Sequence, residues 1–144
     1  MALQAFLILD NDPSPYSVRE LNYDLERRIS SNGKPTSTPK GGIIHCTILS
    51  QGPDKLKFHE WIMGTAKDKR TPLQLGGKFI LPVTDGPKKF MRKLAFSEAY
   101  LVRLSESYSA YSASQMQMHL TISAQTMKFS EANTQTDFVN DEID

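Results

Sequence analysis

The sequence lacks the features that stabilise small secreted proteins and membrane proteins. It contains a single cysteine, Cys46, so no disulfide can form within one chain. No apolar run approaches the roughly 20 residues that a membrane helix needs. The first residues do not show the basic segment and apolar core of a cleaved secretory signal. We therefore expect cytoplasmic assembly, no membrane insertion, and export, if any, without a signal peptide.

The chain also has almost no net charge. Its 17 basic and 16 acidic side chains give a formal charge of +1. Nucleic-acid-binding proteins usually carry a clear basic excess, so we expect no nucleic-acid partner. Short basic clusters at residues 67–70 and 88–93 are typical of solvated faces.

The patterns that usually carry catalysis are missing as well. The three histidines, His45, His59 and His119, show none of the spacings of zinc sites. No G-x-S-x-G motif is present, and the pairs Gly41–Gly42 and Gly76–Gly77 do not match a phosphate-binding loop. These glycines fit the starts of strands, where the backbone needs unusual angles or close approach. We expect no catalytic residue, no cofactor and no metal, and a protein that is not an enzyme.

Short segments of β-strand character fill most of the chain. Apolar runs and apolar–polar alternation, bounded by turn residues, predict strands. The predicted strands are Leu3–Leu9, Tyr16–Ile29, Ile43–Leu49, Lys78–Val83, Phe90–Phe96, Ala99–Tyr108 and Met116–Met127. A different apolar spacing between Pro53 and Gly64 predicts one short helix.

This element pattern predicts a mostly β fold. About seven strands joined mostly by short turns favour an antiparallel β-barrel, or a sandwich, with one short α-helix. We expect a single domain over residues 1–130. The stretch 131–144 is acidic and is expected to be a C-terminal tail rather than part of the core.

Two predicted strands separate their side chains into two faces. In the second strand the apolar positions are Leu21, Tyr23 and Leu25, and the polar positions are Glu20, Asn22, Asp24 and Glu26. In the sixth strand one face has Tyr100, Val102 and Leu104, and the other has Leu101, Arg103 and Ser105. Such regular alternation is typical of strands with one side in the core and one in water.

Several segments, taken in order, resemble one known family. They are Leu21–Arg28, Ser31–Ser37, Gly41–Ile43, Phe96–Val102 and Met118–Ser123. In this order, with the loop Asn32–Ser37 leading into the paired glycines, the chain is similar to the haemolysin-coregulated tube protein, TssD-like, of the bacterial type VI secretion system. The resemblance runs from about Leu3 to Met127 and includes the single helix between the third and fourth strands.

The resemblance implies a barrel protomer that assembles into a hexameric ring. Rings would stack into a hollow tube that carries effectors, and the partners would be copies of the chain, the sheath, the baseplate and tip, and effector proteins. The resemblance places the ring-stacking loop at Arg28–Gly42, with Arg28, Asn32, Gly33, Lys34, Pro35, Thr36, Gly41 and Gly42. The polar strand faces supply the candidates for the lumen wall, which are Glu20, Asn22, Asp24, Glu26, Arg103 and Ser105, together with Leu101.

Three alternatives remain open from the sequence. The first is a tube protein of a phage-tail-like extracellular injection system, which shares the architecture. The second is a monomeric ligand-carrying barrel, which requires an empty interior, although the strands have many large apolar residues to fill it. The third is a small hydrolase, for which the sequence offers no active-site residue.

Overall fold

The structure, a computed structural model, describes residues 4–49, 56–64, 73–108, 116–131 and 134–139. It contains seven strands and one helix, in the order β1 (Ala5–Leu9), β2 (Asp12–Tyr23), β3 (Ile43–Leu49), α1 (Lys57–Met63), β4 (Leu75–Asp85), β5 (Lys88–Ser107), β6 (Gln117–Glu131) and β7 (Thr134–Val139). The predictions of a mostly β fold and of one short helix after the third strand are confirmed.

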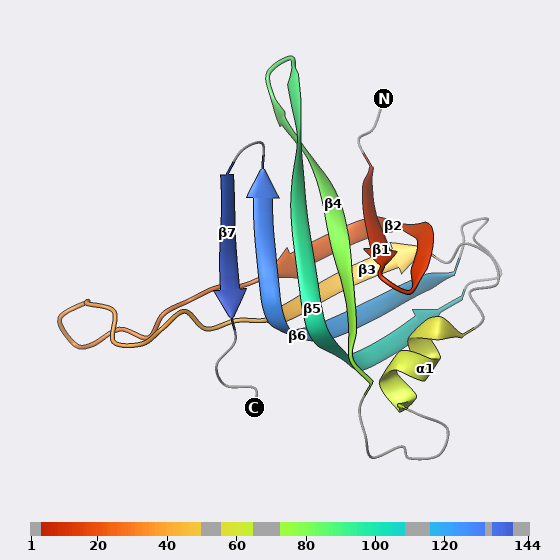
Figure 1. The fold of residues 1–144 in the computed structure, drawn as a ribbon, viewed down its shortest axis with the longest axis horizontal. Helices are drawn as coiled ribbons and strands as arrows, with labels where there is room; N and C mark the ends of the chain where they lie inside the picture. Colours follow the sequence, from red (N-terminus) through yellow and green to blue (C-terminus); the bar gives the residue numbers. More distant parts are fainter. Residues whose placement is uncertain (1–3, 50–55, 65–72, 109–115, 132–133, 140–144) are drawn as a thin grey trace.

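The strands close into a barrel (Figure 1). They follow the order β3-β2-β1-β4-β5-β6-β7, and β3 also pairs with β6. This extra pairing joins six strands into a closed circle, with β7 added outside it on β6. Every pairing is antiparallel. The predicted barrel is therefore confirmed, and the sandwich is not what forms.

The strands β5 and β6 belong to both halves of the barrel. One half of β5 pairs along β4, and the other half, beyond Ala99, lies beside β6 alone among the described strands. The strand bends at Glu98, whose φ of 51° lies in the left-handed region. The bend reverses the alternation, so Phe96 and Ala99 are both buried. The predicted strands Phe90–Phe96 and Ala99–Tyr108 are thus parts of one bent strand.

A glycine pair lies opposite this bend. The β4–β5 register shifts between Leu75 and Gly77, where Gly76 of β4 lies opposite two residues of β5, Ser97 and Glu98, so the extra residue belongs to β5. A Cβ at Gly76 would lie 3.1 Å from the carbonyl oxygen of Phe96, and one at Gly77 would lie 2.9 Å from that of Ile8. The prediction that these glycines allow neighbouring backbone segments to approach closely is confirmed.

The helix α1 packs against one side of the barrel. Its buried residues are Phe58 and Trp61. Phe58 meets Tyr16 edge to face at 5.1 Å between ring centroids, and Trp61 stacks on Phe96 at 6.4 Å. The indole Nε1–H of Trp61 donates to the Ala99 carbonyl oxygen at 3.1 Å. The helix begins at Lys57, later than predicted, and residues 53–55 lie outside the described part.

The barrel interior is filled by side chains. The buried apolar residues form one cluster: Leu7, Leu9, Tyr16, Ile44, Cys46, Ile48, Phe58, Trp61, Phe79, Leu94, Phe96, Ala99, Leu101, Met118, Leu120, Ile122, Ala124, Met127 and Phe138. They come from every strand and from α1. This packing is the core that a domain of this size needs.

Other element boundaries also differ from the prediction. The strand β2 ends at Tyr23 instead of Ile29, and Leu25 is 46% exposed because the chain has by then left the barrel. Thr134–Val139 forms β7 on β6, and Phe138 is buried opposite Met127. The interpretation of 131–144 as a tail outside the core is therefore wrong for β7. Its strand pattern is short, and only Phe138 and Val139 are apolar in it. Residues 140–144 lie outside the described part, and the division at residue 130 stays a prediction.

Candidate functional site

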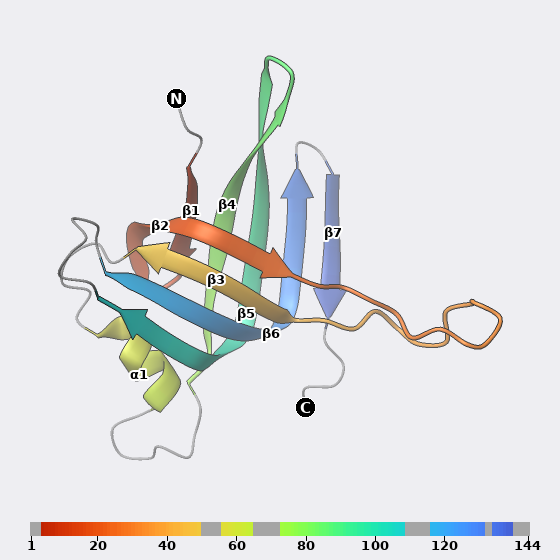
Figure 2. The same ribbon diagram turned by 180° about the vertical axis from the view of Figure 1, so that it is seen from behind.

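A wall of polar side chains covers the outside of β2, β3, β6 and β5. Two cross-strand rows form it, as the pairing registers show. The first row is Glu20, Thr47, His119 and Ser105, and the second is Asn22, His45, Thr121 and Arg103. These eight residues, together with Cys46 and Leu120 between them, line a hollow of about 340 Å³. We call these two rows the polar wall; Figure 2 shows the four strands from the side on which they lie side by side.

Hydrogen bonds tie the middle of the polar wall together. His45 Nδ1 lies 3.2 Å from Thr121 Oγ1, and Thr47 Oγ1 lies 2.9 Å from His119 Nδ1. Each bond joins residues of β3 and β6 that are more than 70 positions apart in the chain. The second nitrogen of each ring stays available to a molecule that approaches the wall.

The opposite side of the same strands is dry. Cys46 alternates with His45 and Thr47 and is buried, as are Leu120 and Ile122 on β6. Burial raises the pKa of the Cys46 thiol to about 12, because the interior disfavours the thiolate. The expectation of a buried, unreactive thiol is in line with this position.

The structure brings together four of the predicted lumen candidates and separates two. Glu20, Asn22, Arg103 and Ser105 belong to the polar wall. Asp24 follows the end of β2, and Glu26 lies farther out, where its backbone pairs with Lys40. The other four wall residues, Thr47, His119, His45 and Thr121, were not among the candidates. Their alternation along β3 and β6 was the signal that could have identified them.

A β-bulge corrects the sequence-based faces of β5. The β5–β6 register shifts between Leu101 and Arg103, so Val102 is an extra residue. Leu101 is 4% exposed and belongs to the core, whereas Val102 is 53% exposed. Leu101 is therefore wrong as a lumen candidate. Simple alternation fails here because an inserted residue moves the following side chains to the other face.

A long arm extends from the polar wall between β2 and β3. Residues 24–42 run out and return as two extended segments with a turn at the tip (Figures 1 and 2). Backbone hydrogen bonds between Glu26 and Lys40, at 2.9 and 2.6 Å, hold the segments together. Near the tip, Thr36 N donates to the Arg28 carbonyl oxygen at 2.8 Å. Gly33 makes the turn with a φ of 84°.

All eight residues predicted for the stacking loop lie in this arm. Arg28, Asn32, Gly33, Lys34, Pro35 and Thr36 are exposed toward its tip. The paired glycines lie at its base, where a Cβ on Gly41 would come within 2.6 Å of the Asp24 carbonyl oxygen. Gly42 has a φ of 93°, and its carbonyl oxygen accepts a hydrogen bond from Ala124 N at 2.7 Å. The paired glycines thus bring the arm back onto the barrel.

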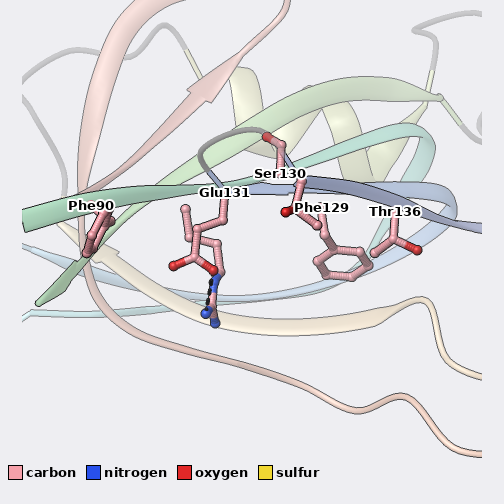
Figure 3. A pocket seen from close by; sticks show the side chains of 7 residues that line it. Phe90, Phe129, Ser130, Glu131 and Thr136 are labelled. Atoms are coloured by element: carbon pink, nitrogen blue, oxygen red, sulfur yellow. Dashed lines mark hydrogen bonds and ion pairs between the residues drawn. The ribbon is translucent and has the colours of Figure 1, made fainter. Parts of the chain in front are cut away.

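A second hollow lies at the far end of β5 and β6 (Figure 3). It measures about 420 Å³ and is lined by Phe90, Arg92, Phe129, Ser130, Glu131, Thr134 and Thr136. Its charged side chains pair with each other, since Arg92 Nη2 lies 3.0 Å from Glu131 Oε2. Its other lining residues are two phenylalanines and three residues with hydroxyl groups.

The described residues contain no cluster of three or more His, Cys, Asp and Glu that could hold a metal ion. His59 of α1 contacts the Glu106 carboxylate of β5, which joins the helix to the end of that strand. Within the described ranges, no helix is long and apolar enough to cross a membrane.

Comparison with known proteins places this barrel in a family. A model of the hemolysin coregulated protein Hcp (TssD) family matches residues 1–138. No curated protein matches the chain at a significant level.

Solved structures share the fold at low sequence identity. Hcp1 from Flavobacterium johnsoniae is 22% identical with a TM-score of 0.66, and the match covers 94% of this chain and 100% of that one. A structure described as a type six secretion system protein is 8% identical with a TM-score of 0.72, over 96% of both chains. The secreted protein Hcp3 from Pseudomonas aeruginosa is 8% identical with a TM-score of 0.63, over 96% of this chain and 99% of that one. Because the family model spans nearly the whole sequence, the chain belongs to the hemolysin coregulated protein Hcp (TssD) family, and it is a tube subunit of type VI secretion.

Proposed function

We propose that this chain builds hexameric rings that stack into the tube, with the polar wall lining the bore. One observation carries the proposal: eight polar side chains form two unbroken rows across four strands on the outside of a barrel that is already full. A strand face in bulk water needs no such continuity. A face that lines a water-filled channel does, because an apolar patch would hold cargo by burying area.

The composition of the polar wall suits the passage of many different proteins. Its eight side chains include one acid, Glu20, and one permanent cation, Arg103. The others are hydroxyl, amide and imidazole groups, which exchange hydrogen bonds with water readily. The wall offers no large apolar contact and no strong field of one sign, so effectors could travel through the bore with little retention.

The filled interior argues against the ligand-carrying alternative. Large side chains such as Phe79, Phe96 and Trp61 occupy the space that a barrel ligand would need. The hollow over the polar wall lies on the outside of the barrel, and the other lies at the far end of β5 and β6. The protein therefore acts through its surfaces, in contacts with copies of itself and with other proteins.

The arm is the part that we assign to contacts between rings. It projects beyond the barrel along the direction of β2 and β3 (Figure 2). Between residues 27 and 40 its charged side chains are Arg27, Arg28, Lys34 and Lys40, and all of them are basic. A basic, projecting segment is suited to bind an acidic surface on the next ring. The outer surface of the ring would meet the sheath, the end of the tube would meet the baseplate and tip, and the subunit would leave the cell with its cargo.

Electron microscopy of the purified protein tests this proposal. We expect annular particles with a central hole, and stacks of them at high concentration. A gold cluster attached through maleimide to a Ser105→Cys variant should appear inside the hole. The unaltered chain is the control, because its only thiol is the buried Cys46. Particles that stay monomeric at high concentration, or gold outside the ring, would contradict the proposal.

A further inference from the structure

The polar wall ends in two strand margins. On one side, β1 pairs with β2 only as far as Val18, so residues 19–23 of β2 have β3 as their single strand partner among the described strands. On the other side, β4 pairs with β5 only as far as Ala99, so residues 100–107 of β5 have β6 as their single strand partner in the described chain. In Figure 2, β2 and β5 are the outer strands of the four. A strand margin of this kind is a template for pairing with another chain.

Opposite charges occupy these two margins on the same face. Glu20 lies on the β2 margin and Arg103 on the β5 margin, each at the end of a wall row. Both are exposed, and neither has an ion pair or a side-chain hydrogen bond with any described residue. With β3 and β6 between them, the two margins are about 14 Å apart, which is three strand spacings, and the two residues also lie in different rows. They cannot pair within one chain.

The strand directions allow the two margins to join. Each pairing from β2 through β3 and β6 to β5 is antiparallel, so β2 and β5 run in opposite directions. If β5 of one protomer lies beside β2 of the next, the antiparallel order continues without a break. Because the two margins are different surfaces, the contact is head to tail, and such a contact builds a ring when the rotation between subunits closes, as in the proposed hexamer.

We propose that Glu20 of one protomer forms an ion pair with Arg103 of the next protomer on the inner surface of the ring. This inference depends on the ring of the proposed function and names the contact that closes it. If the rows of neighbouring protomers are aligned, Arg103 lies opposite Asn22 of the next protomer and diagonal to its Glu20. If the two strands are shifted by two residues, Arg103 lies directly opposite that Glu20. The long side chain of Arg103 reaches Glu20 in both arrangements, since diagonal neighbours are roughly 7–8 Å apart. The pair also neutralises the one acid and the one permanent cation of the polar wall within the bore.

Charge reversal tests this contact by ring stability. We expect Glu20→Arg and Arg103→Glu each to raise at least about tenfold the protomer concentration at which half of the chain is in rings, since each puts like charges side by side. The double variant restores opposite charges and should return this concentration to within about threefold of the unaltered chain. Native mass spectrometry or ultracentrifugation over a dilution series measures it. Lys93→Glu, an exposed reversal on β5 away from the wall, is the matched control.

Cross-linking tests the adjacency without relying on energies. In a Glu20→Cys/Arg103→Cys variant, a short bis-maleimide should link chains into a ladder up to hexamers on a denaturing gel. Each single-cysteine variant should give at most traces of dimer, and Cys46 stays buried and unreactive. Circular dichroism confirms that each variant folds.

The outcomes separate this inference from the proposed function. If the unaltered chain forms rings but the double reversal is no better than the single ones, or no ladder forms, the Glu20–Arg103 contact is wrong and the ring stands. If the unaltered chain forms no rings at all, the proposed function fails with it. Rescue by the double reversal together with a ladder supports both.

Discussion

Replacing Trp61 tests how α1 is held against the barrel. The side chain is 1% exposed and stacks on Phe96 with an angle of 6° between the rings. Its Nε1–H donates to the Ala99 carbonyl oxygen, one residue after the bend in β5. Trp61→Phe removes this donor and part of the ring, and Trp61→Ala removes nearly all contacts.

The expected losses follow from buried area and from the orphaned carbonyl group. A buried tryptophan removes roughly 150–250 Å² from water, and its truncation to alanine typically lowers the free energy of unfolding by about 3–5 kcal/mol. For Trp61→Phe we expect a loss of about 2 kcal/mol. Roughly half comes from the smaller apolar area, and roughly half from the unsatisfied carbonyl oxygen. In a chain of this size, that loss corresponds to a fall in Tm of about 4–8 °C.

Urea unfolding followed by far-UV circular dichroism measures these values. All variants must be compared at one protomer concentration, because association raises apparent stability. Met63→Ala is the control on the same helix, since Met63 is 58% exposed and should change stability by less than about 0.5 kcal/mol. If Trp61→Phe unfolds at the same urea concentration as the unaltered chain, the hydrogen bond to Ala99 does not stabilise the fold and this reasoning is refuted.

Two further predictions concern the arm and the buried thiol. Pro35→Glu combined with Thr36→Glu places acids at the basic tip of the arm and should impair stacking of rings more than their formation, as electron microscopy would show; equal loss of both would mean that the arm does not mediate stacking. Cys46 should stay unmodified by a thiol reagent at pH 8 until urea unfolds the chain, and rapid labelling of the folded protein would contradict its burial. Because the pKa of Cys46 rises from 9.0 to about 12 on folding, only the unfolded chain releases this proton between those values. The free energy of unfolding should therefore fall by about 1.4 kcal/mol per pH unit over that range.

Much of the fold could be predicted because its signals are local. The alternation of Met118, Leu120 and Ile122 with His119 and Thr121 separates a dry face from a wet one, and the structure places the first set in the core. The single helix was also recognisable, because Trp61 and its neighbours break the strand pattern. The arm residues were grouped correctly as a segment, although their hairpin-like pairing was not foreseen.

The errors arose where one residue changes the direction of the strand. The bend at Glu98 and the bulge at Val102 each reverse the side-chain alternation, and neither position carries a glycine or proline that would mark it. The short strand around Phe138 was missed because its apolar content is low. It forms because β6 offers a long partner for it.

Local alternation determined that this protein has β-strands with one wet and one dry face, since that pattern has a period of two residues along the chain. It could not determine which wet faces meet. The closing pairing of β3 with β6 decided that, by bringing His45 to Thr121 and His119 to Thr47. Such contacts depend on register between distant segments, which only the packed barrel sets. The polar wall and its charged margins are therefore properties of the tertiary structure.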